Sequence, residues 1–305
     1  MRRLACALLL LAAACGDNFD PVYWVDEPRV LGVVADPPEI DVGQVTTLTA
    51  IVANPTNEPV RYAWFRCDVQ NLPGWSGDTA TACVDNDRDQ PYLVPLGDTS
   101  TVVTTMPDVP LDKLGVPDYT LGLYAQIRLD LDWGDGKRQR TIYRLRRLLP
   151  APIAPNQNPR FRGLFIAPED ADLGAADMTP LPTTEPLASF PANGKLRLQA
   201  LYEDGSAEGF LVIDGDVTKG EVKPATELLR TAWYSDYGTF SQPTTGEAKP
   251  VTELKLDQGK NAKRLPSAIP DEGAVIRLWV VGRDERGGTS LIEGRVRVTP
   301  AVDMK

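Results

Sequence analysis

The sequence contains no histidine among its 305 residues. That absence excludes hydrolases that depend on a Ser-His-Asp or Cys-His arrangement, and it excludes the usual zinc sites with imidazole ligands. Basic residues are in the minority, since 32 Lys and Arg stand against 42 Asp and Glu for a net charge of −10. A chain this acidic repels phosphate backbones, so we do not expect nucleic acid as a partner.

The apolar stretch at the beginning of the chain is too short to cross a bilayer. Arg2 and Arg3 precede the apolar residues Leu4–Ala14, and Cys15 follows directly after three alanines. A charged, then apolar, then small-residue layout is typical of an export signal. With the cysteine in this place, the segment resembles a bacterial lipoprotein signal. The resemblance implies a signal peptide over residues 1–14 and a lipid on Cys15. The alternative is an ordinary secretory signal with an incidental cysteine.

The residues around and after Cys15 indicate where in the cell the protein is held. Losing Arg2 and Arg3, the only charged residues of the signal, changes the net charge from −10 to −12. No polybasic run follows Cys15, so the acyl chains must hold the protein at the membrane. Gly16 stands where an Asp commonly retains lipoproteins at the inner membrane. We therefore expect a lipid-anchored envelope protein at the outer membrane, facing either the periplasm or the outside. Residues 15–28 are polar and interrupted by proline, and they predict a tether.

Cysteine is scarce in the rest of the chain. Cys6 leaves with the signal and Cys15 is the lipid site, which leaves Cys67 and Cys83. An even pair in an oxidising compartment predicts a disulfide. Such a bond closes a loop of about 15 residues and contributes roughly 3 kcal/mol to stability if unstrained. A metal site needs more ligands than these two.

Residues 29–149 show the pattern of β-strands joined by turns. The clearest segment is Tyr119–Leu131, where apolar residues alternate with mostly polar ones, as in a long strand with one buried face. The turn residues Trp133–Gly136 and the returning segment Thr141–Leu148 then predict a hairpin. No segment here sustains a helical period beyond two turns. We expect one domain over residues 29–149, with Trp64 in its core.

The second half repeats the order of the first. Residues 150–159 contain four prolines and predict a semi-rigid linker. After the linker come an apolar lead strand, an alternating strand, an Ala-Trp strand and a long final hairpin. Thr231–Tyr234 occupies the place in this order that Tyr62–Phe65 occupies in the first half. The sequence thus predicts a second domain over residues 160–300, with Trp233 in its core.

Short strands, turns rich in Pro and Gly, and an Ala-Trp strand in each half indicate antiparallel sandwiches. With Trp64 and Trp233 as core tryptophans of the third strand, each half resembles a bacterial immunoglobulin-like domain. The resemblance implies an all-β chain of two tandem immunoglobulin-like antiparallel β-sandwiches. The cysteine pair that usually joins the two sheets of such a domain is absent, and Cys67 with Cys83 closes a local loop instead. The whole also resembles envelope lipoproteins built from a tether and tandem β-sandwiches, a type that implies no particular activity.

Motifs for nucleophilic catalysis and phosphate binding are missing. No Ser is followed three residues later by Lys, and no Gly-Lys pair precedes Ser or Thr. Ser76 lacks the second glycine of a nucleophile elbow. A pair of acids could still hydrolyse glycosides, but the sequence does not give their spacing. We therefore expect a non-enzymatic protein without a cofactor.

Calcium is the metal to consider. Asp85, Asp87 and Asp89 place oxygens at alternate positions, as loops that bind hard cations do. The segment lacks the Gly and Glu that an EF-hand requires. A second partial cluster of acids occupies residues 130–135. Solvated acidic loops explain both clusters, so no metal site is predicted.

Trp75 and Trp133 are the candidate contact residues. Trp75 lies inside the loop that the predicted disulfide closes, and Trp133 stands at the hairpin turn. A closed loop presents an aromatic ring at low entropic cost, and protein partners and sugars both bind such rings. The alternative is that Trp75 folds back over the end of the sandwich.

These observations favour a scaffold or assembly subunit that contacts another envelope protein through its loops or edge strands. A glycan-binding or adhesive module that uses Trp75 is the alternative.

Overall fold

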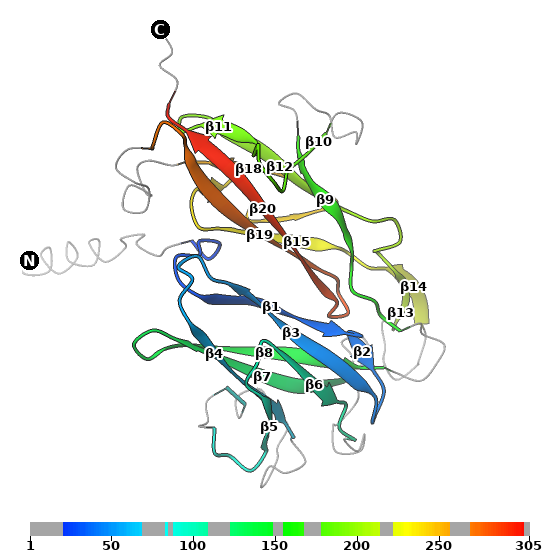
Figure 1. Ribbon diagram of the computed structural model, residues 1–305. Coiled ribbons are helices and arrows are strands. Elements are labelled where there is room, and N and C mark those ends of the chain that lie inside the picture. The colour runs from blue at the N-terminus through cyan, green and yellow to red at the C-terminus, as the bar shows by residue number, and fades with distance from the viewer. Residues whose placement is uncertain are drawn as a thin grey trace, which may run out of the picture.

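The structure, a computed structural model, describes residues 21–68, 83–84, 88–108, 123–148, 155–167, 178–213, 222–256 and 269–301. These residues form twenty strands, β1 to β20, in five sheets. Figure 1 shows two β-sandwiches stacked on each other, one built from β1 to β8 and the other from β9 to β20. The protein is therefore all-β with tandem immunoglobulin-like sandwiches, as the sequence predicted. Within the described residues, no helix has the length and apolar character that crossing a bilayer requires.

The N-terminal sandwich packs a three-stranded sheet against a five-stranded sheet. The smaller sheet has the order β1 (Arg29–Asp36), β3 (Val45–Ala53), β6 (Thr101–Thr105). The larger sheet has the order β2 (Glu39–Ile40), β8 (Lys137–Arg147), β7 (Leu123–Trp133), β4 (Val60–Cys67), β5 (Leu93–Gly97). The short β2–β8 pair is parallel and the other pairs are antiparallel.

Alternation along β7 decides which residues form the core of this sandwich. The odd positions within Ala125–Leu131 are at most 4% exposed and pack with Trp64 between the sheets. The prediction of one buried face is confirmed, and the strand continues to Trp133. The other face differs from the expectation of a polar exposed surface, because Arg128 and Asp130 are also fully buried.

The C-terminal sandwich packs two five-stranded sheets against each other. The first has the order β10 (Thr179–Pro180), β9 (Phe161–Ile166), β12 (Lys195–Tyr202), β18 (Val251–Lys255), β16 (Thr239–Phe240). The second has the order β11 (Ser189–Pro191), β20 (Thr289–Thr299), β19 (Ala274–Arg283), β15 (Arg230–Ser235), β17 (Thr244–Gly246). A separate hairpin pairs β13 (Gly209–Ile213) with β14 (Val222–Thr226).

The two sandwiches repeat one order of strand pairing. β1 pairs with β3 as β9 pairs with β12, and β4–β7–β8 corresponds to β15–β19–β20. Trp64 on β4 and Trp233 on β15 are both fully buried, which confirms their prediction as core residues. Each indole N–H is satisfied, by the Thr99 carbonyl at 2.9 Å and by the Thr245 hydroxyl at 2.8 Å.

The segment before β1 packs against the C-terminal sandwich, although it leads directly into the N-terminal one. Val25 donates its N–H to the Ser235 carbonyl at 2.9 Å, and Ser235 donates to the Tyr23 carbonyl at 3.1 Å. The indole N–H of Trp24 donates to the Gly238 carbonyl, and the Trp24 side chain is buried. Within the predicted tether over residues 15–28, Tyr23, Trp24 and Val25 are therefore held against the C-terminal sandwich, and residues 15–20 lie outside the described part.

Candidate functional site

The predicted disulfide is present at one end of the N-terminal sandwich. Cys67 and Cys83 are bonded, with their Cα atoms 6.2 Å apart, and both are buried. They pack with Phe65, Tyr92 and Leu93 in a small apolar cluster on the outer face of the larger sheet. Trp75, which this bond encloses in sequence, lies outside the described residues, as do Cys15, Asp85 and Asp87.

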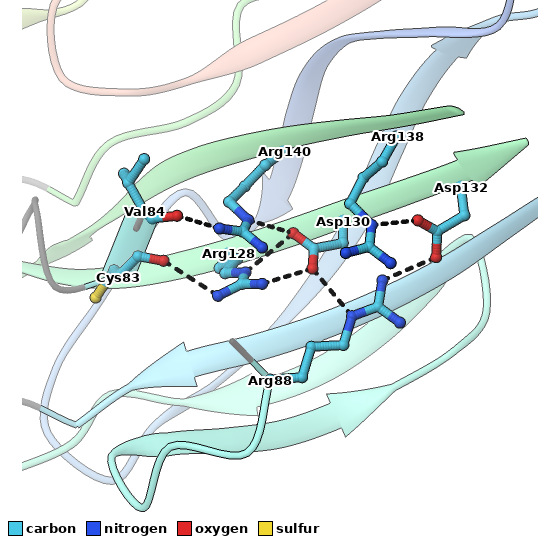
Figure 2. Close-up of polar contacts among 8 residues, drawn as sticks. All are labelled: Cys83, Val84, Arg88, Arg128, Asp130, Asp132, Arg138 and Arg140. Atoms are coloured by element: carbon cyan, nitrogen blue, oxygen red, sulfur yellow. Dashed lines mark hydrogen bonds and ion pairs between the residues drawn. The ribbon is translucent and has the colours of Figure 1, made fainter. Parts of the chain in front are cut away.

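A network of arginines and aspartates lies next to the disulfide (Figure 2). The carboxylate of Asp130 accepts hydrogen bonds from Arg128 at 2.7 and 2.9 Å, from Arg140 at 2.9 Å and from Arg88 at 3.1 Å. Arg88 also donates to Asp132 at 2.8 Å. Arg128 and Asp130 have no exposed side-chain surface. The network therefore joins neighbouring positions of β7 and β8 to Arg88 on the segment before β5.

The same arginines hold the chain that follows Cys83. Arg128 donates to the Cys83 carbonyl at 3.4 Å, and Arg140 donates to the Val84 carbonyl. Arg88, a few residues later in the chain, reaches the Asp130 carboxylate from the side opposite Cys83 and Val84 (Figure 2). Cys83 and Val84 are thus held on the sheet by hydrogen bonds from charged side chains, which are stronger than neutral ones.

The network also fixes the ionisation of its acids. Burial on its own raises the pKa of Asp130, but hydrogen bonds from Arg128 and Arg140 outweigh it and lower that pKa to about 2. For Asp132, burial also opposes ionisation, and hydrogen bonds from Arg138 and Arg88 lower its pKa overall. Neither acid can serve as a proton donor near neutral pH, because both stay ionised and paired.

These contacts bear on one of the two candidate calcium clusters, that over residues 130–135. Asp130 and Asp132 use their oxygens on arginines, so the cluster over residues 130–135 does not offer a cation site. Asp89, the one member of the other cluster that is described, is exposed. Within the described ranges, no group of three or more Asp, Glu, Cys or His residues is placed to hold a metal ion.

Trp133 does not present its ring to a ligand. It stands at the end of β7, is 6% exposed and packs in the core with Leu131 and Val60. The expectation that Trp133 is a contact residue is therefore wrong. The positive φ angles of Gly134 and Gly136 turn the chain into the hairpin and leave Trp133 on the inner face.

An apolar cluster joins the two sandwiches. It combines side chains of the segment before β1 and of β1, β3 and β19, each at most 5% exposed: Val25, Leu31, Ile51, Ala53, Trp279 and Val281. Burial of such side chains stabilises the contact by roughly 25 cal/mol per Å² of apolar surface. The two sandwiches consequently share a hydrophobic interface.

A buried charge cluster centred on Arg286 lies at the same interface. Arg286 follows β19 and is 1% exposed, and it bonds Glu227 at 2.5 Å and Glu208 at 2.7 Å. Its Nη1 lies 3.7 Å from Glu39 of the N-terminal sandwich. Glu39 in turn pairs with Arg146 at 2.9 Å. One guanidinium thus binds carboxylates from both sandwiches.

The described part of the predicted linker, residues 155–159, is fixed within this interface. Asn156 donates its backbone N–H to Glu39 at 3.0 Å and its side-chain amide to Asp284 at 3.2 Å. The amide of Asn158 donates to the Ala35 carbonyl of β1 at 2.7 Å, and its oxygen accepts the N–H of Thr289 at 2.8 Å. The two asparagines therefore bridge the sandwiches rather than merely separating them.

A pocket of about 430 Å³ opens beside these contacts, within the size range of small-ligand sites. Its walls are β1, the middle of β8 and the turn between β19 and β20. Tyr124, Tyr143 and Arg144 line it from the N-terminal sandwich, and Arg283 and Asp284 line it from the C-terminal one. This is a site between the sandwiches that the sequence did not suggest.

The pKa of Asp284 lies well above the ordinary value for an aspartate. Burial, followed by the nearby negative charge of Glu227, raises the pKa of Asp284 to about 6. Its Oδ1 accepts the N–H groups of Arg286 at 2.8 Å and Gly288 at 2.7 Å, which shape the turn. Asp284 is therefore a structural acid that titrates below neutral pH.

No protein family matches the chain, and no curated protein is similar to it. Among solved structures, it is similar to three N-terminal domains of the Highly Immunogenic Outer Capsid protein of bacteriophage RB49, with 11% identity, a TM-score of 0.21, and coverage of 88% of this chain and 58% of that one. It is also similar to domains EC1-4 of Drosophila N-cadherin, with 9% identity, a TM-score of 0.20, and coverage of 88% and 49%. The chain spans about half the length of these structures. Neither likeness bears on its function.

Proposed function

We propose that this protein is a non-enzymatic, lipid-anchored scaffold or assembly subunit of the cell envelope. In this proposal Cys15 carries the lipid and holds the chain at the outer membrane. The partner is another envelope protein, which binds loops or strand edges of the two sandwiches. The observation that carries the proposal is the interface between them, which contains both an apolar cluster and the Arg286 charges. A joined pair of sandwiches presents surfaces at fixed positions, which lowers the entropic cost of binding a partner.

The buried acids favour a structural role over catalysis. Each fully buried acidic side chain in the described ranges is paired with arginine: Glu39, Asp68, Asp130, Glu227 and Asp236. An arginine paired with a buried carboxylate compensates the cost of taking that carboxylate out of water, so the pair supports the fold. This pattern supports the expectation of a protein without enzymatic activity.

The packing of Trp24 also supports a defined position near the membrane. Pro21 is the first described residue, and it stands six positions after Cys15. Six residues reach at most roughly 20 Å when fully extended. A lipid on Cys15 therefore keeps the contact between Trp24 and the C-terminal sandwich close to the bilayer surface, which leaves the N-terminal sandwich free to meet a partner.

The test is co-purification of the lipidated protein after brief cross-linking in its own cells, read by mass spectrometry. We expect one envelope protein in near-equal amount. A Cys15→Ser variant tests the anchor, because it should lose membrane attachment. Recovery of cell-wall or surface polysaccharide with no stoichiometric protein would contradict the scaffold and favour the glycan-binding alternative. In that case Trp75→Ala should abolish polysaccharide retention.

A further inference from the structure

The pocket between the sandwiches lies along an unpaired strand edge. Among the described strands, β1 pairs with β3 alone, and its other edge faces the pocket, β8 and the turn after β19. Figure 1 shows the β19–β20 hairpin reaching the end of β1. A strand edge with free N–H and C=O groups is a template for another strand.

Side-chain groups cap this edge on both sides of the pocket. At Val30, the Gln139 amide accepts the backbone N–H at 2.7 Å and donates to the C=O at 3.2 Å. At Ala35, the carbonyl accepts from Asn158 at 2.7 Å. Arg283 donates to the Leu31 carbonyl at 2.5 Å. Each of these groups takes the place of a neighbouring strand.

Val33, between the capped positions, directs its backbone toward the pocket. Its register partner Ala50 donates its N–H to Ser100 at 2.9 Å, on the opposite side of β3 from β1. Because facing residues of an antiparallel pair either exchange both hydrogen bonds or none, Val33 does not bond Ala50. The N–H and C=O of Val33 therefore point away from β3. Val33 lines the pocket, and among the described residues no group is seen to bond this backbone on that side.

The facing wall offers a second strand edge, that of β8 beyond β2, which pairs with no other strand in the described ranges. Leu148 donates its N–H to the Ile40 carbonyl at 2.8 Å, which shows that even-numbered residues here direct their backbone toward β2. β8 has no register shift over its length, so Ile142 and Arg144 face the same way beyond the end of β2. Both residues line the pocket. The pocket is thus bordered by backbone edges from both sheets of the N-terminal sandwich.

Arg144 supplies a charge at this site. Its guanidinium lies over the Tyr124 ring, 6.0 Å from the centroid, and its side chain is exposed. Within the described ranges, this guanidinium forms no ion pair. A cation held over an aromatic ring beside free backbone groups is suited to a carboxylate on an extended chain.

We infer that the pocket binds an extended peptide segment of a partner protein, which pairs with the edge of β1 at Val33 and places an acidic side chain on Arg144. The inference rests on the proposed scaffold function and specifies where the partner docks. Addition of a strand to a sheet edge gives affinity through the main chain, and side-chain contacts such as that of Arg144 give specificity. A pocket of about 430 Å³ accommodates a short segment rather than a whole domain.

The test uses a display library of random heptapeptides, panned on the full-length mature protein in detergent. We expect enriched peptides with β-branched residues and an Asp or Glu. Arg144→Glu should weaken their binding at least tenfold. Arg162→Glu, which makes the same charge change at an exposed position of β9, should change it less than twofold. Amide exchange at Val33, followed by NMR, should slow when peptide is added.

A second pair of variants compares a bulky side chain inside the pocket with the same side chain on a surface away from it. Thr141→Trp places a large side chain in the pocket and should abolish peptide binding, whereas Thr101→Trp, on the exposed face of β6, should not. If no library peptide requires Arg144, or if Val33 exchange does not respond, the peptide site is wrong. A Thr141→Trp protein that folds and still cross-links to a stoichiometric partner also overturns the site, while the proposed scaffold function stands. Absence of any partner for the natural protein, with peptide binding intact, overturns only the scaffold.

Discussion

The guanidinium of Arg286 in the C-terminal sandwich lies 3.7 Å from the carboxylate of Glu39 in the N-terminal sandwich. Both side chains are almost fully buried, and Arg286 also binds Glu208 and Glu227. The contact joins two units whose cores are separate, since Trp64 and Trp233 belong to different clusters. This buried cation is therefore one of the contacts that fix the relative position of the sandwiches.

Arg286→Leu should destabilise the protein by about 3 to 5 kcal/mol, because it leaves buried carboxylates without their cation. Urea unfolding followed by circular dichroism measures this loss. The matched control is Arg160→Leu, whose ion pair with Glu203 is exposed, and an exposed pair contributes at most about 1 kcal/mol. Equal losses in the two variants would contradict a central role for Arg286.

Asp284→Asn should change the pH dependence of stability. The pKa of Asp284 rises from 3.8 to about 6 on folding, so between these values the folded protein binds more protons than the unfolded chain. The free energy of unfolding therefore falls as pH rises through this window. The variant lacks this titration, so its stability relative to the natural protein should increase from pH 4 to pH 7, by up to roughly 3 kcal/mol.

The Asn substitution keeps an oxygen for the N–H groups of Arg286 and Gly288. Its new amide can donate to Oδ1 of Asn156, which has no partner among the described residues, once the Asn156 amide rotates. Asp204→Asn, at an exposed turn, is the control and should give no such trend. Parallel pH profiles for natural protein and Asp284→Asn would show that Asp284 does not titrate in this range.

Asp130→Asn should have the opposite pH dependence. The folded pKa of Asp130 is about 2 against an ordinary 3.8, so ionised Asp130 stabilises the fold above pH 3.8 and loses this effect as pH falls toward 2. The variant should cost about 3 to 5 kcal/mol at pH 7, because Arg128 stays buried without its carboxylate. The deficit should shrink by about 1 kcal/mol at pH 3. Asp135→Asn, on the exposed turn of the same hairpin, should match the natural protein at both pH values.

Alternation and aromatic placement predicted the sandwiches because these signals are local. The inner face of β7 follows from every second residue between Ala125 and Leu131, and the cores around Trp64 and Trp233 follow from repeated strand patterns. The disulfide followed from the count of cysteines in an oxidising compartment. Each of these inferences depends on residues within one strand or one loop.

The sites on the surface of the sandwiches depend on residues that are distant in sequence. Arg128 and Asp130 are buried because the chain at Cys83, 45 positions before Arg128, crosses their face of the sheet. Arg286 meets Glu227 and Glu208 across 59 and 78 positions. No periodicity connects such residues, so the sequence predicted a solvated face at β7 and gave no signal for the pocket. For the same reason Trp133, beside a polar turn, was mistaken for a contact residue.

Trp24→Ala should destabilise the C-terminal sandwich, although Trp24 precedes the N-terminal one. The indole is buried and donates to the Gly238 carbonyl 214 positions away, so its removal costs packing and a hydrogen bond. We expect a loss of about 3 to 5 kcal/mol in urea unfolding. The amide of Ser235, which donates to the Tyr23 carbonyl, should exchange at least tenfold faster.

The control is Val22→Ala, at a side chain that is 72% exposed, which should change stability by less than about 0.5 kcal/mol. If Trp24→Ala behaves like Val22→Ala, the segment before β1 is not anchored on the second sandwich. The proposed membrane anchor on Cys15 would then not fix the orientation of the protein.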